Sequence, residues 1–157
     1  MSRRGTDSST ERRKAGPRAA GKTGVERWVE NVFFGLVEVV VAGFPALLWL
    51  MDAPYNAEVT FAALVALVTL SLAVGTARNA DSVGWPAMSY QSVPVRIGYH
   101  SLAIVVAVGS GTAIELLADS ALGSLVAAVG VSVAVVGLFP RLVVILRRLP
   151  PWWQGSP

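Results

Sequence analysis

The sequence has 157 residues and a mean hydropathy of +0.57, with 54% hydrophobic residues and only 15% charged residues. A soluble domain carries about 25% charged residues, so the composition argues against both an ordinary soluble enzyme and a disordered chain. The chain has no cysteine and one histidine, which excludes disulfides, thiolate-bound metals and His-rich metal sites within one chain. We therefore expect a multi-pass membrane protein without a cofactor.

Residues 1–27 form a basic amino-terminal tail. They hold eight basic and three acidic residues, a net charge of +5, whereas the whole chain has +3. Ser, Thr, Gly and Ala fill most other positions up to residue 24, and no apolar periodicity is present. Such a segment buries too little surface to offset the entropy of ordering it. We predict that the tail is disordered and cytoplasmic.

Residues 16–23 match the phosphate-loop pattern Gly-x-x-x-x-Gly-Lys-Thr literally. That chemistry needs a strand before the loop and a helix after it, so that backbone N–H groups surround the phosphates. The 15 preceding residues are polar and charged, and they predict no such strand. We interpret the match as fortuitous. Anionic lipid headgroups explain the basic tail more simply than nucleic acid does.

Four apolar stretches follow the tail, each close to the 20 residues that cross a bilayer core as a helix. In lipid every backbone N–H and C=O must pair internally, so isolated apolar runs become helices. We predict helices at about residues 28–51, 59–77, 97–118 and 121–146. The transmembrane domain then covers residues 28–148, and residues 149–157 form an interfacial carboxy-terminal tail.

The basic residues predict the orientation of these helices. All 13 Lys and Arg lie in residues 1–31, 78–96 and 141–157, whereas the turns 52–58 and 119–120 have none. This positive-inside distribution predicts a cell-membrane protein with both termini in the cytoplasm. The Ala, Val and Gly content is typical of GC-rich prokaryotic genomes. Aromatic rings prefer the depth of the headgroups, and we expect five tryptophans to anchor the two rims: Trp28, Trp49, Trp85, Trp152 and Trp153.

Small residues predict how the helices pack, because close backbone approach drives association in lipid. The most regular series lies in the fourth stretch, at spacings of 4, 3, 4 and 3: Gly123, Ala127, Gly130, Ala134 and Gly137. A mean spacing of 3.5 residues predicts a left-handed supercoil. The short turns predict antiparallel neighbours. The expected fold is an all-α integral membrane protein, a left-handed four-helix transmembrane bundle built as two antiparallel hairpins.

Glu38 and His100 are the candidates for an ion or proton site. Glu38 lies six residues, or about 9 Å, inside the first apolar stretch. A carboxylate there costs about 2.5–3.5 kcal/mol, so we expect it to face the bundle. It is either a proton or cation site or a hydrogen-bonded packing carboxyl. His100 lies about 5 Å shallower, and either bonds Glu38 or lies at the interface beside Tyr99.

The sequence LVEVVVAG around Glu38 resembles the small multidrug resistance transporters over about one turn on either side. The resemblance implies a carboxylate that exchanges protons for cations in a dimer. Members of that family typically have a weak charge bias, unlike the one-sided arginines and lysines here.

Two hypotheses follow for the function. The first is a small multi-pass membrane protein without catalytic activity, acting as an accessory, scaffold or assembly subunit. The alternative is a small oligomeric transporter or channel with Glu38 as its coupling site. The expected partners are the bilayer with its anionic headgroups, and a second copy or another membrane protein.

Overall fold

The computed structural model describes residues 24–80, 85–86 and 92–148. The described residues form four helices and no other regular element, which confirms the all-helical prediction: α2 (Gly24–Met51), α3 (Asn56–Asn79), α4 (Val93–Ala118) and α5 (Ala121–Arg148). Each is long and apolar enough to cross a membrane. The predictions for the phosphate-loop match, Trp152 and Trp153 fall outside the described residues.

The helices are longer than hydropathy predicts. α2 begins at Gly24 rather than residue 28, and α3 extends beyond the expected 59–77 at both ends. α4 begins at Val93 instead of residue 97, with Pro94 in its first turn, where a missing N–H costs no hydrogen bond. Hydropathy marks the part of a helix that lies in hydrocarbon. The polar first and last turns continue the same helices beyond it.

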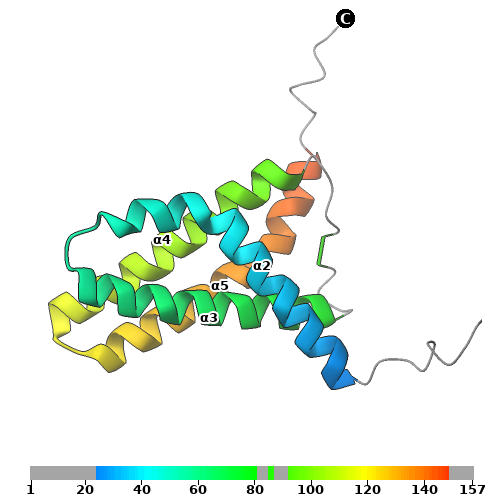
Figure 1. Ribbon diagram of the computed structural model, residues 1–157. Coiled ribbons are helices and arrows are strands. Elements are labelled where there is room, and N and C mark those ends of the chain that lie inside the picture. The colour runs from blue at the N-terminus through cyan, green and yellow to red at the C-terminus, as the bar shows by residue number, and fades with distance from the viewer. Residues whose placement is uncertain (1–23, 81–84, 87–91, 149–157) are drawn as a thin grey trace, which may run out of the picture.

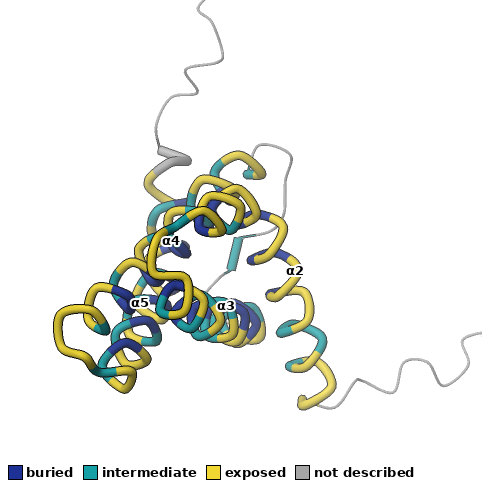
Figure 2. The backbone as a smooth tube through the Cα atoms, turned by 60° about the vertical axis from the view of Figure 1, so that its left-hand side comes forward, coloured by how far each residue is buried: buried dark blue, intermediate teal, exposed yellow. Residues whose placement is uncertain are grey.

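The chain reverses direction in the short segments after α2 and after α4. α3 and α4 lie at the centre of the arrangement and pack against each other. α2 contacts both of them on one side, and α5 contacts both on the other. Buried residues line the inner faces of the helices, and exposed residues cover the outer faces (Figure 2). The first turns of α2 project away from the other helices (Figure 1).

Two glycines allow α2 and α3 to cross closely. A Cβ atom on Gly75 would lie 2.5 Å from Val32 Cα, and one on Gly35 would lie 2.9 Å from the Ser71 carbonyl oxygen. Both obstacles are backbone atoms, which cannot turn aside as a side chain can. The missing side chains at these two positions therefore set the distance between the helices.

The buried positions recur mostly every four residues, with single three-residue steps. In α3 the buried apolar series is Val59, Ala62, Ala66, Leu70 and Val74. Rows at this spacing interlock at larger crossing angles and in the opposite hand to a left-handed coiled coil. In agreement with this, α2 runs obliquely across its neighbours (Figure 1). The buried positions thus do not favour the left-handed supercoil that the 3.5-residue spacing predicts.

The predicted packing seam of α5 is wrong for most of its length. Gly130, Ala134 and Gly137 are exposed, and only Gly123 and Ala127 are half-buried. The buried row lies one or two positions further along the helix: Ser124, Ala128, Ser132, Val136, Phe139 and Val143. Both rows contain small residues at three- and four-residue spacing, so spacing alone does not separate them. The buried row carries the two serine hydroxyls and the large Phe139 ring.

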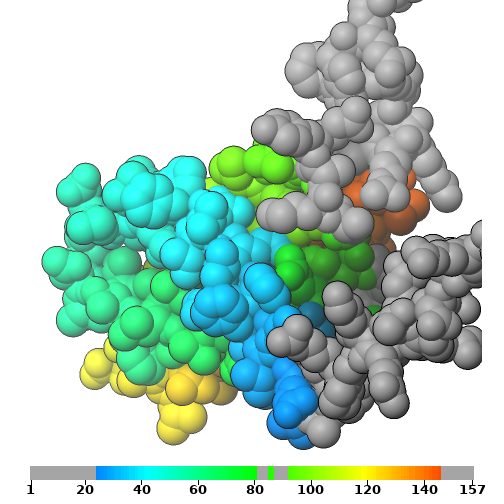
Figure 3. Space-filling view, turned by 45° about the vertical axis from the view of Figure 1, so that its right-hand side comes forward, coloured from blue at the N-terminus to red at the C-terminus, as the bar shows by residue number. Residues whose placement is uncertain are grey.

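Much of the apolar surface faces outward. Only 28–39% of the most apolar window of each helix is buried within the described residues. Figure 3 shows the side chains of α2 spread over one face of the molecule, and many of them are large and apolar, including Phe33, Phe34 and Phe44. Soluble monomers rarely expose apolar patches beyond a few hundred Å². The surface therefore suits a lipid environment.

The helix crossing yields a prediction about Gly75. Gly75→Ala should lower the free energy of unfolding by about 1–3 kcal/mol, because the added methyl must push the α2 backbone away. SDS titration of the protein in mixed micelles measures this loss. Gly137→Ala is the matched control, since a Cβ there meets no atom within 4 Å. Equal stabilities of the two variants would contradict the close crossing.

Candidate functional site

A buried cluster of charged side chains surrounds Glu38. The Glu38 side chain is 2% exposed, and its two carboxylate oxygens accept hydrogen bonds from different helices. Arg78 of α3 donates to Oε2, and Arg96 of α4 donates to Oε1. His100 Nε2 lies 3.3 Å from the same Oε1 atom, and its side chain is 1% exposed. Glu38 is oriented inward, as expected, and of the two alternatives for His100 the structure shows the contact with Glu38 rather than an exposed interfacial ring.

The periodicity of the helices brings these residues together. Arg96 and His100 are four residues apart in α4 and therefore lie on one face. Arg78 lies in the last turn of α3, close to the point where that helix passes α2. Glu38 lies between Gly35 and Ala42 on the buried face of α2. Glu38 thus joins three helices through side chains that are far apart in the sequence.

Arg96 also connects the cluster to the α3–α4 connection and to α5. Its other terminal nitrogen, Nη2, donates to the Pro86 carbonyl oxygen. Its guanidinium carbon lies 5.5 Å from the centre of the Phe139 ring, within the range of a cation–π contact. The rings of Trp85 and Tyr99 lie 5.0 and 4.8 Å from the same Phe139 ring. Arg96 therefore links α2, the α3–α4 connection and α5.

The cluster holds more positive than negative charge. Two guanidiniums face one carboxylate, and the Arg78 side chain is 21% exposed, which leaves part of its charge in contact with solvent. Four buried nitrogens have no hydrogen-bond partner among the described residues: Arg78 Nε, Arg96 Nε, His100 Nδ1 and Trp85 Nε1. An added cation would be repelled by both arginines. The described residues also contain no group of three His, Cys, Asp or Glu side chains able to hold a metal ion.

The expected tryptophan anchors occupy different environments. Trp28 is half-buried, and its indole N–H donates to Thr76 Oγ1 at 3.2 Å. Trp49 is 65% exposed near the α2–α3 turn, as an interfacial ring would be. Trp85 instead packs against Phe139 beside the cluster. Only Trp49 thus has the exposure that we expected of a rim anchor, because the other two rings also serve as contacts within the protein.

Sequence reasoning missed the two arginine partners of Glu38. It counted Arg78 and Arg96 only as cations that fix the orientation of the chain. One signal was present, since Arg96 precedes His100 by four residues on a face that continues through Ile104. An arginine on the buried face of an apolar helix needs a counter-charge. The first apolar stretch contains one acid that could supply it, which is Glu38.

The chain belongs to a family defined by a domain of unknown function (DUF8215), whose model matches residues 22–146. The match covers all four helices except the last two residues of α5. Neither the curated proteins nor the solved structures contain a significant match.

The cluster predicts a large cost for removing the carboxylate. Glu38→Gln should lower the free energy of unfolding by about 3–5 kcal/mol, because it leaves two buried guanidiniums without their counter-charge. Glu115→Gln is the matched control, since Glu115 forms no ion pair with any described residue. SDS titration in mixed micelles compares both variants with the unaltered protein.

A second substitution distinguishes lost charge from lost shape. Arg96→Gln in the Glu38→Gln background restores the net charge of the original cluster and should recover a large part of the stability. If the double variant is as unstable as the sum of its single variants, the ion pair is not what holds these helices together.

Proposed function

We propose that this protein is a small accessory or assembly subunit of the cell membrane, without catalytic activity of its own. In this proposal the four helices span the bilayer as two antiparallel hairpins, and both termini lie in the cytoplasm. The apolar outer surface supports the membrane location. The location of all 13 basic residues in residues 1–31, 78–96 and 141–157, with none in the turns after α2 and after α4, supports the orientation.

One observation carries the choice of an accessory role over transport. Both oxygens of Glu38 are occupied by guanidiniums, so the carboxylate serves as a joint between α2, α3 and α4. A coupling carboxylate has to release its partners in order to bind a proton or cation in turn. Freeing Glu38 would break the contacts that hold three helices and would expose two buried arginines to hydrocarbon. The arrangement favours a fixed fold.

The exposed small-residue face of α5 supports the binding of a membrane partner. Gly130, Ala134 and Gly137 leave the backbone of α5 open on the outer surface. A Cβ atom on Gly130 or Gly137 would meet nothing within 4 Å. Helices in lipid associate through such faces because backbones can approach closely. We place the contact with a transmembrane helix of the partner on this face.

The alternative function is a small oligomeric transporter or channel that uses Glu38. The observation in its favour is the direct contact between Glu38 and His100 in a buried position. Acidic and histidine side chains at membrane depth commonly mark proton pathways. Proton or cation transport of this kind requires the carboxyl group of Glu38 itself. A purely structural contact between the helices requires only that the charges of the cluster are balanced.

Cross-linking in native membranes tests the accessory role. We expect a stable complex with a different membrane protein, and we expect Gly130→Leu to reduce its yield at least severalfold by blocking close approach. Leu125→Phe, at an exposed position on another side of the same helix, should leave the yield unchanged. Recovery of a homodimer alone, or equal yields from both variants, would refute the proposed contact.

A flux measurement tests the alternative. The Glu38→Gln/Arg96→Gln double variant keeps the net charge of the cluster but lacks the acid. In proteoliposomes with an imposed pH gradient, we expect the unaltered protein and the double variant to show the same proton leak and the same uptake of tetraphenylphosphonium. Uptake by the unaltered protein that the double variant lacks would replace the accessory role with transport.

A further inference from the structure

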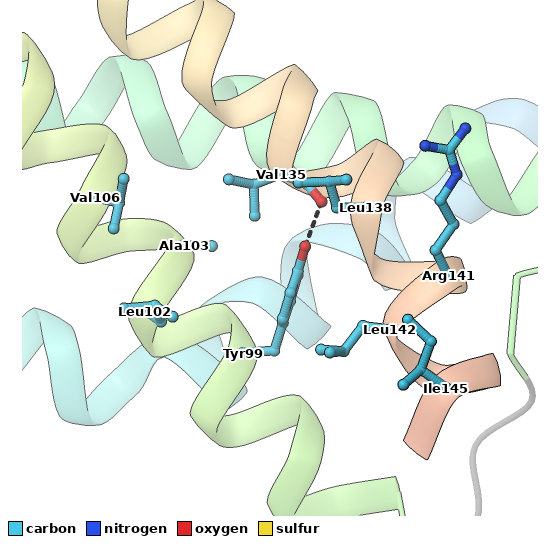
Figure 4. Close-up of a pocket in the computed structure, with 9 residues that line it drawn as sticks. All are labelled: Tyr99, Leu102, Ala103, Val106, Val135, Leu138, Arg141, Leu142 and Ile145. Carbon is cyan, nitrogen blue, oxygen red and sulfur yellow. Dashed lines mark hydrogen bonds between the residues drawn. The ribbon is translucent and has the colours of Figure 1, made fainter. Parts of the chain in front are cut away.

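A groove between α4 and α5 lies apart from the Glu38 cluster. It has a volume of about 460 Å³, and apolar side chains of both helices line it, among them Leu102, Val106, Leu138 and Leu142 (Figure 4). The Tyr99 hydroxyl in its wall donates to the Val135 carbonyl oxygen, so its proton is already used. The groove therefore presents hydrocarbon surface and no available donor along most of its length.

Arg141 is the charged residue of the groove lining. It is exposed and has no ion-pair partner among the described residues. Figure 4 shows its guanidinium directed away from Leu142 and Ile145, beyond the apolar lining. Arg141 lies seven residues, or about 10 Å, before the end of α5. In this structure the guanidinium is directed back along α5, and rotation of its long, flexible stem carries the charge toward the headgroups while the methylenes stay at the groove.

The other end of the groove lies deep in the proposed membrane. Val106 is in the middle of α4, so the groove extends from Ile145, near the end of α5, past Arg141 and toward the centre of the bilayer. An amphiphile with an anionic group at one end and a hydrocarbon chain at the other matches this distribution. A second transmembrane helix fits less well, because it would cover the guanidinium with apolar surface.

We propose that the groove binds one anionic phospholipid of the cytoplasmic leaflet, with its phosphate on Arg141 and one acyl chain between α4 and α5. This proposal rests on the orientation given in the proposed function, but not on the accessory role. The charge selects anionic over zwitterionic lipid, since one cation near the membrane surface contributes about a fivefold preference. The apolar walls retain the acyl chain. Substitutions at Arg141 and in the apolar walls separate the contribution of the charge from that of the acyl-chain contact.

Native mass spectrometry of the full chain, released from vesicles of equal phosphatidylglycerol and phosphatidylcholine, tests the proposal. We expect one retained phosphatidylglycerol per chain. Arg141→Gln should reduce its preference over phosphatidylcholine about fivefold, while Arg27→Gln, an exposed cation outside the groove, should not. Val106→Phe should lower the retention of both lipids by narrowing the groove. Val133→Phe is its control, at an exposed position of α5 that does not line the groove.

Three results would overturn the proposal. Equal lipid retention by Arg141→Gln and Arg27→Gln would show that the bound lipid is unspecific. Retention of a free fatty acid without a phosphate would assign the groove to another ligand. A dimer that Val106→Phe dissociates would assign it to a second copy of the chain. None of these results affects the hetero-complex or flux measurements, so those measurements test the accessory role independently.

Discussion

The fold depends on the neutralisation of one carboxylate below the membrane surface. A charged side chain inside an apolar helix is tolerated where it finds a partner within the bundle. Glu38 finds two, and they come from α3 and α4. Water exclusion does not drive helices together in lipid, so such a polar contact and the close α2–α3 crossing at Gly75 determine how α2 is placed. α5 joins through Phe139, which packs against the aromatic side of the same cluster.

The sequence predicted the feature that the lipid environment determines, which is the presence of four helices. It missed the feature that depends on contacts between helices, which is the face that a helix buries. Four apolar stretches of sufficient length fix four helices, because hydrocarbon leaves the backbone no other way to satisfy its hydrogen bonds. The same argument does not predict which face of each helix is buried. In α5, the row through Gly130 and the row through Ser132 both contain small residues and lie one or two residues apart, and the bundle buries the second. In water the polarity of the two faces would have separated them, but lipid gives no such signal.

The candidate site likewise has features that the sequence predicted and features that it missed. The depth of Glu38 predicted that it faces the bundle, but the sequence left open whether His100 bonds Glu38 or lies at the interface, and the structure brings the two side chains together. Arg78 and Arg96 already had an explanation as positive-inside residues, which hid their second role. A cation that orients the chain need not end in the headgroups. Arg96 is 2% exposed and is directed inward, where its guanidinium donates hydrogen bonds to Glu38 and to the Pro86 carbonyl oxygen.

The charges of the cluster are unevenly divided between the two halves of the chain. Glu38 and Arg78 belong to α2 and α3, which are joined by a short turn, and form a neutral pair by themselves. Arg96 and His100 come with α4 and share the oxygen Oε1. Their docking adds a positive charge to a pair that is already neutral.

The partial exposure of Arg78 lets that excess positive charge reach solvent at the end of α3. A fully enclosed Arg78 would make the same docking far more costly, because both guanidiniums would then share one carboxylate within hydrocarbon. The position of Arg78 in the last turn of its helix is thus what allows one acid to hold three helices.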